Sequence, residues 1–489
     1  MGERLSQYQV GFNKSVRLEA RPERITSEAG ALLTREVLEG LGILRFLGEH
    51  LEDTRNPRLI THPLVEMVAT SLLLMCQGWR DQDDADALRH DGALRLAVST
   101  RLGVAALQAR EQQDCQRDDA AKPCGLASQP TLSRMVKMLS TQRNQRVLKD
   151  ALVRMAGERI RREQGGRRMQ HMTIDVDSLP IPVGGHQSGS EYNGHYRERI
   201  FHPIVASVAE TGDILDAELR PGNVHTALGA SDFIFAVVDK AEQHICQVAS
   251  VRMDAGFPGE QLLSGLEGRS IHYVARIKNN GKLGRMAEPH LEHAVLEMSC
   301  ETSGTRMYEC EYRASSWSRA RRVVLVVQKR ADELLTHHFW LVTSWSRTEY
   351  PPEDLLRHYR ERGTAEGVMG ELMNVLNPAL SSTARPKSHY RDQVPQKRYL
   401  PGDCFAQNQV LMLLNLLAYE TIHTLRQTMQ KATRTGWSIK RTQERVLRVA
   451  ARIVLHARRA VVVIEQRAAD CWSPLLRHLR MLLGPAPAS

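Results

Sequence analysis

The spacing of hydrophobic residues predicts helices in the first third of the chain. Between Thr26 and about Glu163, apolar side chains recur at intervals of three and four residues, which is typical of amphipathic helices. Pro63 opens one of these helices and Ser128 precedes another, since proline is tolerated in a first turn and serine is a good N-cap. The pattern indicates a mainly α-helical region over residues 1–165.

From His171 onward, short β-branched stretches alternate with helical ones. The chain order is three strands, a helix, a strand, a helix and a fifth strand. These stretches span residues 172–177, 201–210, 214–220, 227–242, 245–254, 259–266 and 271–278. The order is the one expected of an RNase H-like α/β core with a mixed five-stranded sheet, and we expect its first part to occupy residues 166–279.

Beyond this core the pattern changes twice more. Residues 280–350 alternate charged segments with two strand-like runs, which predicts a β-rich insertion. A Pro-Pro pair then opens a helix, and we expect residues 351–378 to complete the core. We expect residues 379–489 to form a basic and mainly helical C-terminal region.

The positive charge of the chain is concentrated near its end. Residues 421–489 hold 13 Lys or Arg against 3 Asp or Glu, an excess that equals the net charge of +10 for all 489 residues. A basic surface of this kind favours an acidic partner, most simply DNA. The alternative is a pair of solvated basic helices without a partner.

Hydrophobicity argues against a membrane protein. The apolar run at residues 72–76 is far shorter than the ~18 residues that a membrane span requires. Met1 is followed by polar and charged residues rather than by the core of a signal peptide. We therefore expect a cytoplasmic protein with no membrane partner.

Acidic residues near the ends of strand-like stretches are candidates for metal binding. Asp175 and Asp177 are two positions apart, so both face the same side of one strand. Asp254 follows a later strand-like stretch, although Asp before Ala-Gly is also a common turn sequence. Two carboxylates on one face of a core are costly unless they bind a cation or another positive group.

A third group of polar residues is predicted on a late helix. At 3.6 residues per turn, Tyr359, Arg362 and Glu366 fall within about 60° of each other on one helix face. Arg362 and Tyr359 could hold a phosphate group by charge and by hydrogen bond. The alternative is an exposed ion pair between Arg362 and Glu366. Three carboxylates on two strands and a helix are what a two-metal phosphoryl-transfer site needs.

With these residues, the chain resembles the DDE transposases of bacterial insertion sequences. Members of this family have acids on the first and fourth strands of an RNase H-like core and a glutamate on a late helix. A subgroup with a β-rich insertion carries the motif Y-x2-R-x3-E-x6-K, to which Tyr359, Arg362 and Glu366 correspond. Met373 stands where that motif has lysine. Further segments that resemble this group are 25–30, 83–91, 192–197, 201–203 and 220–225.

The resemblance implies a metal site and a cofactor. Asp177, Asp254 and Glu366 would be the catalytic and metal-binding triad, with Asp175 as the alternative first acid. We prefer Asp177 because the small hydroxyl residue Ser178 follows it directly. The cofactor would be Mg²⁺, with two ions in the site and Mn²⁺ as a possible substitute.

The resemblance also implies contacts with DNA. Tyr359 and Arg362 would contact the phosphate at the transposon end, and Trp317 would stack on an unpaired base. Arg385 and Lys387 are basic residues that could compensate for the methionine at position 373. For the tryptophans of the insertion, the alternative is packing in the β-sheet core.

The implied function is transposition of a bacterial insertion sequence. The enzyme would cleave double-stranded DNA at the inverted-repeat ends and join the freed 3′-OH to target DNA, as a homodimer in the nucleoid-associated cytoplasm. Residues 1–165 and 379–489 would bind DNA, and the latter would also dimerise. Two alternatives stay open. The chain could be an RNase H-like nuclease or resolvase that cuts without joining, or an inactive transposase-derived repressor, which Met373 favours.

Overall fold

The computed structural model describes most of the chain. It covers residues 8–9, 12–13, 15–18, 23–101, 105–107, 125–167, 169–183, 187–331, 333, 335–373, 380, 401–456 and 459–484. For residues 8, 9, 17, 364–366 and 401–403 it describes the backbone alone. The statements below refer to these residues.

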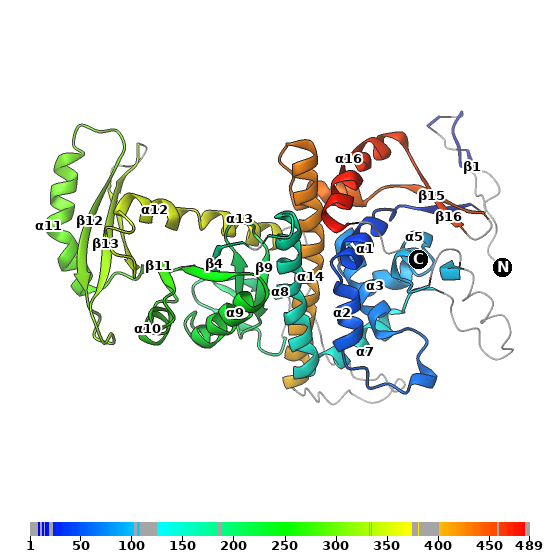
Figure 1. Ribbon diagram of the computed structural model, residues 1–489, viewed down its shortest axis with the longest axis horizontal. Coiled ribbons are helices and arrows are strands. Elements are labelled where there is room, and N and C mark those ends of the chain that lie inside the picture. The colour runs from blue at the N-terminus through cyan, green and yellow to red at the C-terminus, as the bar shows by residue number, and fades with distance from the viewer. Residues whose placement is uncertain are drawn as a thin grey trace.

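An eight-stranded mixed sheet forms one half of the molecule (Figure 1). Its strand order is β12-β13-β14-β11-β10-β4-β8-β9. In chain order the strands are β4 (His171–Ser178), β8 (Ile204–Val208), β9 (Ile214–Glu218), β10 (Gln247–Met253), β11 (His272–Ile277), β12 (Gly304–Tyr312), β13 (Arg321–Lys329) and β14 (His337–Thr343). Strand β10 runs parallel to both β4 and β11, and the other neighbours are antiparallel. The predicted mixed α/β architecture is confirmed.

Helices cover both faces of this sheet, because its strands are apolar on both sides. One face packs against α9 (Ala230–His244), α10 (Glu260–Gly268) and α11 (Gly281–Glu297), and the other against α12 (Pro352–Arg360). In Figure 1, α12 and the following α13 (Gly363–Glu371) run along one side of the sheet, opposite α9 and α10. Val251 and Met253 point into the core beneath α9 and α10. Since side chains alternate along a strand, Arg252 points to the α12 side.

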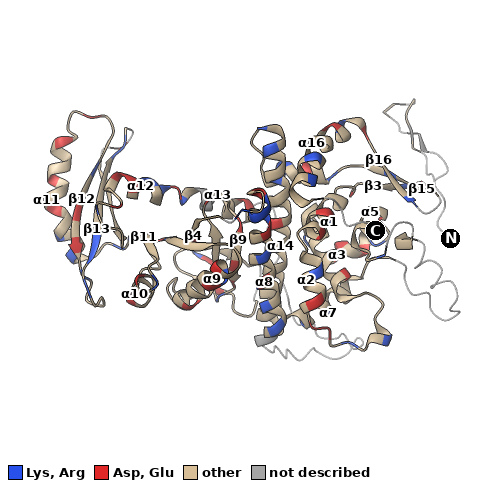
Figure 2. Cartoon of the chain, in the orientation of Figure 1, with Lys and Arg blue, Asp and Glu red and all other residues tan. Residues whose placement is uncertain are grey.

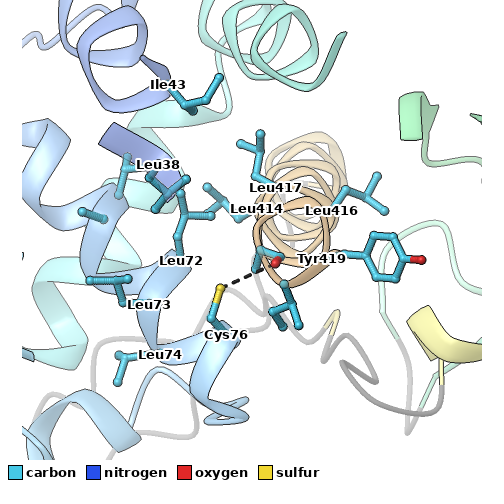
Figure 3. Packing of buried hydrophobic residues seen from close by; sticks show 14 of the residues in the cluster. Leu38, Ile43, Leu72, Leu73, Leu74, Cys76, Leu414, Leu416, Leu417 and Tyr419 are labelled. Atoms are coloured by element: carbon cyan, nitrogen blue, oxygen red, sulfur yellow. Dashed lines mark hydrogen bonds between the residues drawn. The ribbon is translucent and has the colours of Figure 1, made fainter. Parts of the chain in front are cut away.

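The other half of the molecule is a helical assembly around one long helix. Its elements are α1 (Ala31–Gly40), α2 (Ile43–His50), η1 (Pro57–Leu59), α3 (Leu64–Gln77), α4 (Asp84–Ala87), α5 (Gly92–Val98), α7 (Gln129–Leu139), α8 (Gln142–Glu163), α14 (Pro401–Thr433), α15 (Ile439–Thr442), η3 (Gln443–Leu447) and α16 (Gln466–Leu483). Helix α14 contacts α3, α8 and α16. Figure 3 shows leucines of α3 and α14 packed together beside Cys76, whose thiol donates to the carbonyl of Ala418 at 3.5 Å. This core lies between the sheet and the outer helices.

Two regions contain an element that the sequence did not indicate. The C-terminal region was expected to be mainly helical, and it also contains β15 (Ala451–His456) and β16 (Arg459–Ile464), a hairpin that pairs with β3 (Arg24–Thr26). Buried and exposed positions alternate along β15, but one of its exposed positions holds the apolar Val454, so the sequence does not show that period of two. The β-rich insertion also contains a 17-residue helix, α11, whose helical pattern is interrupted by Pro289.

The remaining strands are short. They are β1 (Tyr8–Gln9), β2 (Arg17–Leu18), β5 (Ile181–Pro182), β6 (Glu191–Asn193) and β7 (Glu198–Phe201). Strands β5, β7 and β6 form a small sheet directly after β4. None of the helices in the described part of the chain combines the length and the hydrophobicity needed to span a bilayer.

Candidate active site

The parallel pairing of β4 and β10 brings two predicted acids together. Asp175 lies opposite Arg252, and Val176 lies opposite Met253. Asp177 and Asp254 each directly follow this last pair, so the register brings Asp177, near the end of β4, close to Asp254, the first residue after β10. Both acids are partly exposed. The carboxyl ends of neighbouring parallel strands therefore present two carboxylates at one edge of the sheet.

Asp175 occupies a different environment from Asp177. It is 2% exposed, and the Arg252 guanidinium donates to both of its carboxylate oxygens, each at 2.7 Å. Burial raises the pKa of Asp175, and the hydrogen bonds from Arg252 oppose that rise. Asp177, in contrast, is partly exposed and accepts from the backbone N–H of Ser178 and from Arg362, so only Asp177 can be reached from outside the core.

The junction between α12 and α13 is held over these acids by arginines. Arg252 also donates to the carbonyl of His358 at 2.7 Å and to the Glu361 carboxylate at 3.2 Å. Arg362 donates to Oδ2 of Asp177 at 2.8 Å. This arrangement corrects the prediction of a single helix, because α12 ends at Arg360 and α13 begins at Gly363. The two residues between these helices, Glu361 and Arg362, have helical dihedral angles, so the chain turns little between α12 and α13.

The other predicted residues of this segment have varied surroundings. Tyr359 is 8% exposed and packs with leucines of α12 against the sheet. Glu366 lies on α13, but its side chain is outside the described residues, so its position near the acids stays a prediction. Met373 is partly buried against the helical core. Arg385 and Lys387 also lie outside the described residues.

Comparison with known proteins identifies the family. The model of the family "Transposase DDE domain group 1" matches residues 8–387. The chain belongs to this family of DDE transposases. The predicted membership of the DDE transposases is thereby confirmed.

Similarity to curated proteins and to solved structures is weak. No curated protein matches the transposase chain significantly. Among solved structures, it aligns with the cryo-EM structure of a piggyBac transposase synaptic complex with hairpin DNA, at a TM-score of 0.40 and 9% sequence identity. The alignment covers 94% of this chain and 83% of that chain. This likeness is too weak to carry an argument about fold or function.

Trp317 of the transposase is placed unfavourably for base stacking. Its side chain is in the core, 6% exposed, with Tyr312 at its edge and the Arg321 guanidinium 5.0 Å from its ring centroid. Its ring is therefore already covered by protein. Trp340 is 1% exposed, as expected for packing in the sheet core.

Sequence reasoning missed two residues that shape this site. Arg252 was overlooked, although a buried arginine two positions before Asp254 requires an acidic partner on the same face. Tyr196, in the β6–β7 hairpin, is 37% exposed and makes an edge contact with His202. Burial raises the pKa of Tyr196, and the negative charges of Asp177 and Asp254 add to that rise. Its segment carried no signal beyond the family resemblance.

The donor set suits a hard divalent cation. Among the described residues, the Asp254 carboxylate has no hydrogen-bond or ion-pair partner, and that of Asp177 is paired with Arg362. Carboxylate oxygens are the ligands that Mg²⁺ prefers. Among the described side chains, to which that of Glu366 does not belong, no three metal-ligating groups form a cluster. The two described acids can therefore supply part of a metal site, which a third ligand must complete.

The different roles of Asp175 and Asp177 can be separated by substitution. We expect Asp175→Asn to lower the free energy of unfolding by roughly 2 kcal/mol, because the charged hydrogen bonds of buried Arg252 are weakened while Glu361 and a carbonyl remain as partners. Asp177→Asn breaks the partly exposed ion pair with Arg362, so we expect the free energy of unfolding to fall by at most about 1 kcal/mol. Urea denaturation measures both values. A stable but inactive Asp175→Asn variant would identify Asp175 as the ligand instead.

Proposed function

We propose that this transposase cleaves DNA at the inverted-repeat ends of an insertion sequence and joins the freed 3′-OH to target DNA. The observation that carries the proposal is the parallel register of β4 and β10, in which Asp177 and Asp254 each directly follow the last pair, Val176 and Met253, while Arg362 of the α12–α13 junction donates to Asp177. Phosphodiester chemistry needs little from a protein beyond positioning and charge, and this arrangement offers both.

The fold that we propose for the catalytic part is an RNase H-like core. Strands β9, β8, β4, β10 and β11 are adjacent in that order, with the first three antiparallel and the last three parallel. This topology supports a core in which the first and fourth strands along the chain lie side by side. The insertion then extends the sheet through β14, β13 and β12.

In the proposed mechanism, Asp177, Asp254 and Glu366 would hold two Mg²⁺ ions, for which Mn²⁺ could substitute. The ions would neutralise the phosphate and activate the attacking hydroxyl group. Arg362 pairs with Asp177 in the described state, and its guanidinium can turn to a phosphate oxygen when DNA enters. Arg252 donates both to Asp175 of β4 and to the carbonyl of His358, so it fixes the α12–α13 junction relative to the sheet. Glu366 follows this junction on α13 and would reach the metal ions from there.

DNA binding is proposed for the helical half. Figure 2 shows Lys and Arg on α8, α14 and α16, which belong to the regions 1–165 and 379–489. A phosphate backbone is the natural partner of such a surface. Because the two ends of an element must be processed together, we propose a homodimer on DNA, in a bacterial cytoplasm with access to the nucleoid. Arg385 and Lys387 are proposed as additional DNA contacts.

A cleavage and joining assay tests this function. Duplexes spanning the DNA that flanks the coding sequence are incubated with the protein, a target plasmid and Mg²⁺. We expect a break with a 3′-OH at one discrete position, followed by covalent joining to the plasmid, and we expect chelation of the metal to prevent both. Cleavage without joining would instead support a nuclease or resolvase. Tight binding with no cleavage in Mg²⁺ or Mn²⁺ would support a repressor.

A further inference from the structure

A cavity opens beside Asp254, on the side away from Asp177. Its volume is about 270 Å³, and it lies where β10 and β11 end and β14 begins. Asp254, Arg276, Lys278, Asn279 and Phe339 contribute to its walls. Since β11 follows β10 in the sheet, this cavity continues the edge on which the two acids lie.

The cationic side chains of this cavity lack acidic partners. Within the described ranges, no carboxylate pairs with Lys278 or Arg276, and both residues are exposed. The Arg276 guanidinium lies over the Phe339 ring, 4.6 Å from its centroid, which orients it without neutralising it.

Other arginines of the same sheet are neutralised. Arg321 pairs with Glu260 and Glu267, and Arg322 pairs with Glu309. Around the cavity, in contrast, no described carboxylate forms an ion pair with Arg276 or Lys278, so both keep their positive charge next to the proposed metal site. An anionic ligand would supply the missing charge.

The size of the cavity restricts the ligand. Its volume is below the roughly 300–1,000 Å³ of typical small-molecule sites, so it suits one phosphate group with part of its sugar better than a whole cofactor. A DNA strand with one phosphate at Asp177 and Asp254 can continue along this end of the sheet either toward β4 or toward β11. In the β4 direction, Tyr196 and His202 are packed against each other near the acids. Toward β11, the DNA strand would reach the cavity.

We propose that this cavity is a subsite for the phosphodiester adjacent to the scissile one, with Lys278 as its main contact. Lys278 contributes the charge, Arg276 a second charge above Phe339, and Asn279 an amide that can donate a hydrogen bond. The proposal deepens the proposed function and rests on it. The phosphodiester belongs to the element-end strand or to the target strand, which share the same chemistry.

Substitution of Lys278 tests the subsite. Lys278→Gln removes one charge at the carboxyl end of β11. Arg269→Gln is the matched control, because it removes one charge near the opposite end of the same strand, where Arg269 is paired with Asp239. Affinities for the flanking-DNA duplex and for a target duplex are measured without divalent metal over a range of salt concentrations. We expect Lys278→Gln to bind several-fold more weakly, with a salt slope reduced by about one, and the control to match the wild type.

The two possible sources of the phosphodiester give different results. Weaker binding to the flanking-DNA duplex together with slower cleavage assigns the subsite to the element-end strand. Normal cleavage with slower joining of pre-cut ends and weaker binding to target duplex assigns it to the target strand. The proposal is overturned if Lys278→Gln and the double variant Arg276→Gln/Lys278→Gln bind both duplexes, cleave and join like the wild type. A wild-type protein that binds but never cleaves would contradict the proposed function instead, while the binding comparison would still test the subsite.

Discussion

Asp254→Asn is expected to abolish DNA cleavage while leaving the fold and the DNA affinity intact. Among the described residues the Asp254 carboxylate has no partner, so its loss removes no stabilising contact of the folded chain. An amide has nearly the shape of a carboxylate but lacks the charge that a divalent cation requires. Substituting a residue that only supports a metal ligand already lowers metal affinity or activity about 10–100-fold. Losing a direct ligand should therefore lower the cleavage rate by more than about a hundredfold.

The measurement compares cleavage rates with two other properties of the same variant. Thermal unfolding and binding to the flanking-DNA duplex should match those of the wild type. Asp239→Asn is the matched control, since it is an aspartate on α9, 62% exposed, on the opposite side of the sheet. It should cleave normally. If Asp254→Asn retains more than about a tenth of the wild-type rate, the metal site is not at this edge of the sheet.

Local patterns predicted the elements that carry the site, but not the pairing between them. The change from helical spacing to short β-branched runs predicted β4 and β10, and an acid near the end of each. The sequence offered only the neighbouring Ser178 as a reason to prefer Asp177 to Asp175, because both acids face the same side of β4. The residue that gives the two acids different surroundings is Arg252, 77 positions from Asp175 along the chain, and only the strand register brings Arg252 and Asp175 together.

Other differences have equally physical causes. Periodicity predicted one continuous helix through Tyr359 and Arg362, since a two-residue break with helical dihedral angles leaves the pattern of side chains unchanged. Trp317 seemed a candidate for stacking because its sequence neighbours are polar. Its burial depends instead on Tyr312 and Arg321, which tertiary packing places against it. The β15–β16 hairpin depends on β3, more than 400 residues earlier in the chain.

The largest loss of stability is expected where the sheet joins the helical half. Arg159 of α8 and Asp213, just before β9, are 1% and 0% exposed, and the guanidinium donates to both carboxylate oxygens, through Nε at 2.6 Å. Burial alone would raise the pKa of Asp213, but the adjacent Arg159 charge outweighs it and holds that pKa well below its usual range. Glu420 of α14 lies beside the pair, and burial together with the Asp213 charge raises its pKa well above its usual range. Burial therefore favours the protonated form of Glu420, while the carboxylates of Asp213 and Glu163 pair with Arg159.

This difference in protonation predicts opposite results for two similar substitutions. Asp213→Asn removes the most buried counter-charge of Arg159 and leaves Glu163, one turn further along α8, as its remaining ion-pair partner, so we expect the free energy of unfolding to fall by about 3 kcal/mol. Glu420→Gln replaces a neutral acid with a neutral amide that can still accept from the backbone N–H of Ile214, so its loss should be about 1 kcal/mol or less. Urea denaturation measures both. Arg161→Met, on the exposed face of the same helix α8, is the control and should change stability by no more than about 1 kcal/mol. If the two carboxyl substitutions prove equally costly, Glu420 is charged in the folded protein and the charge assignment of the cluster is wrong.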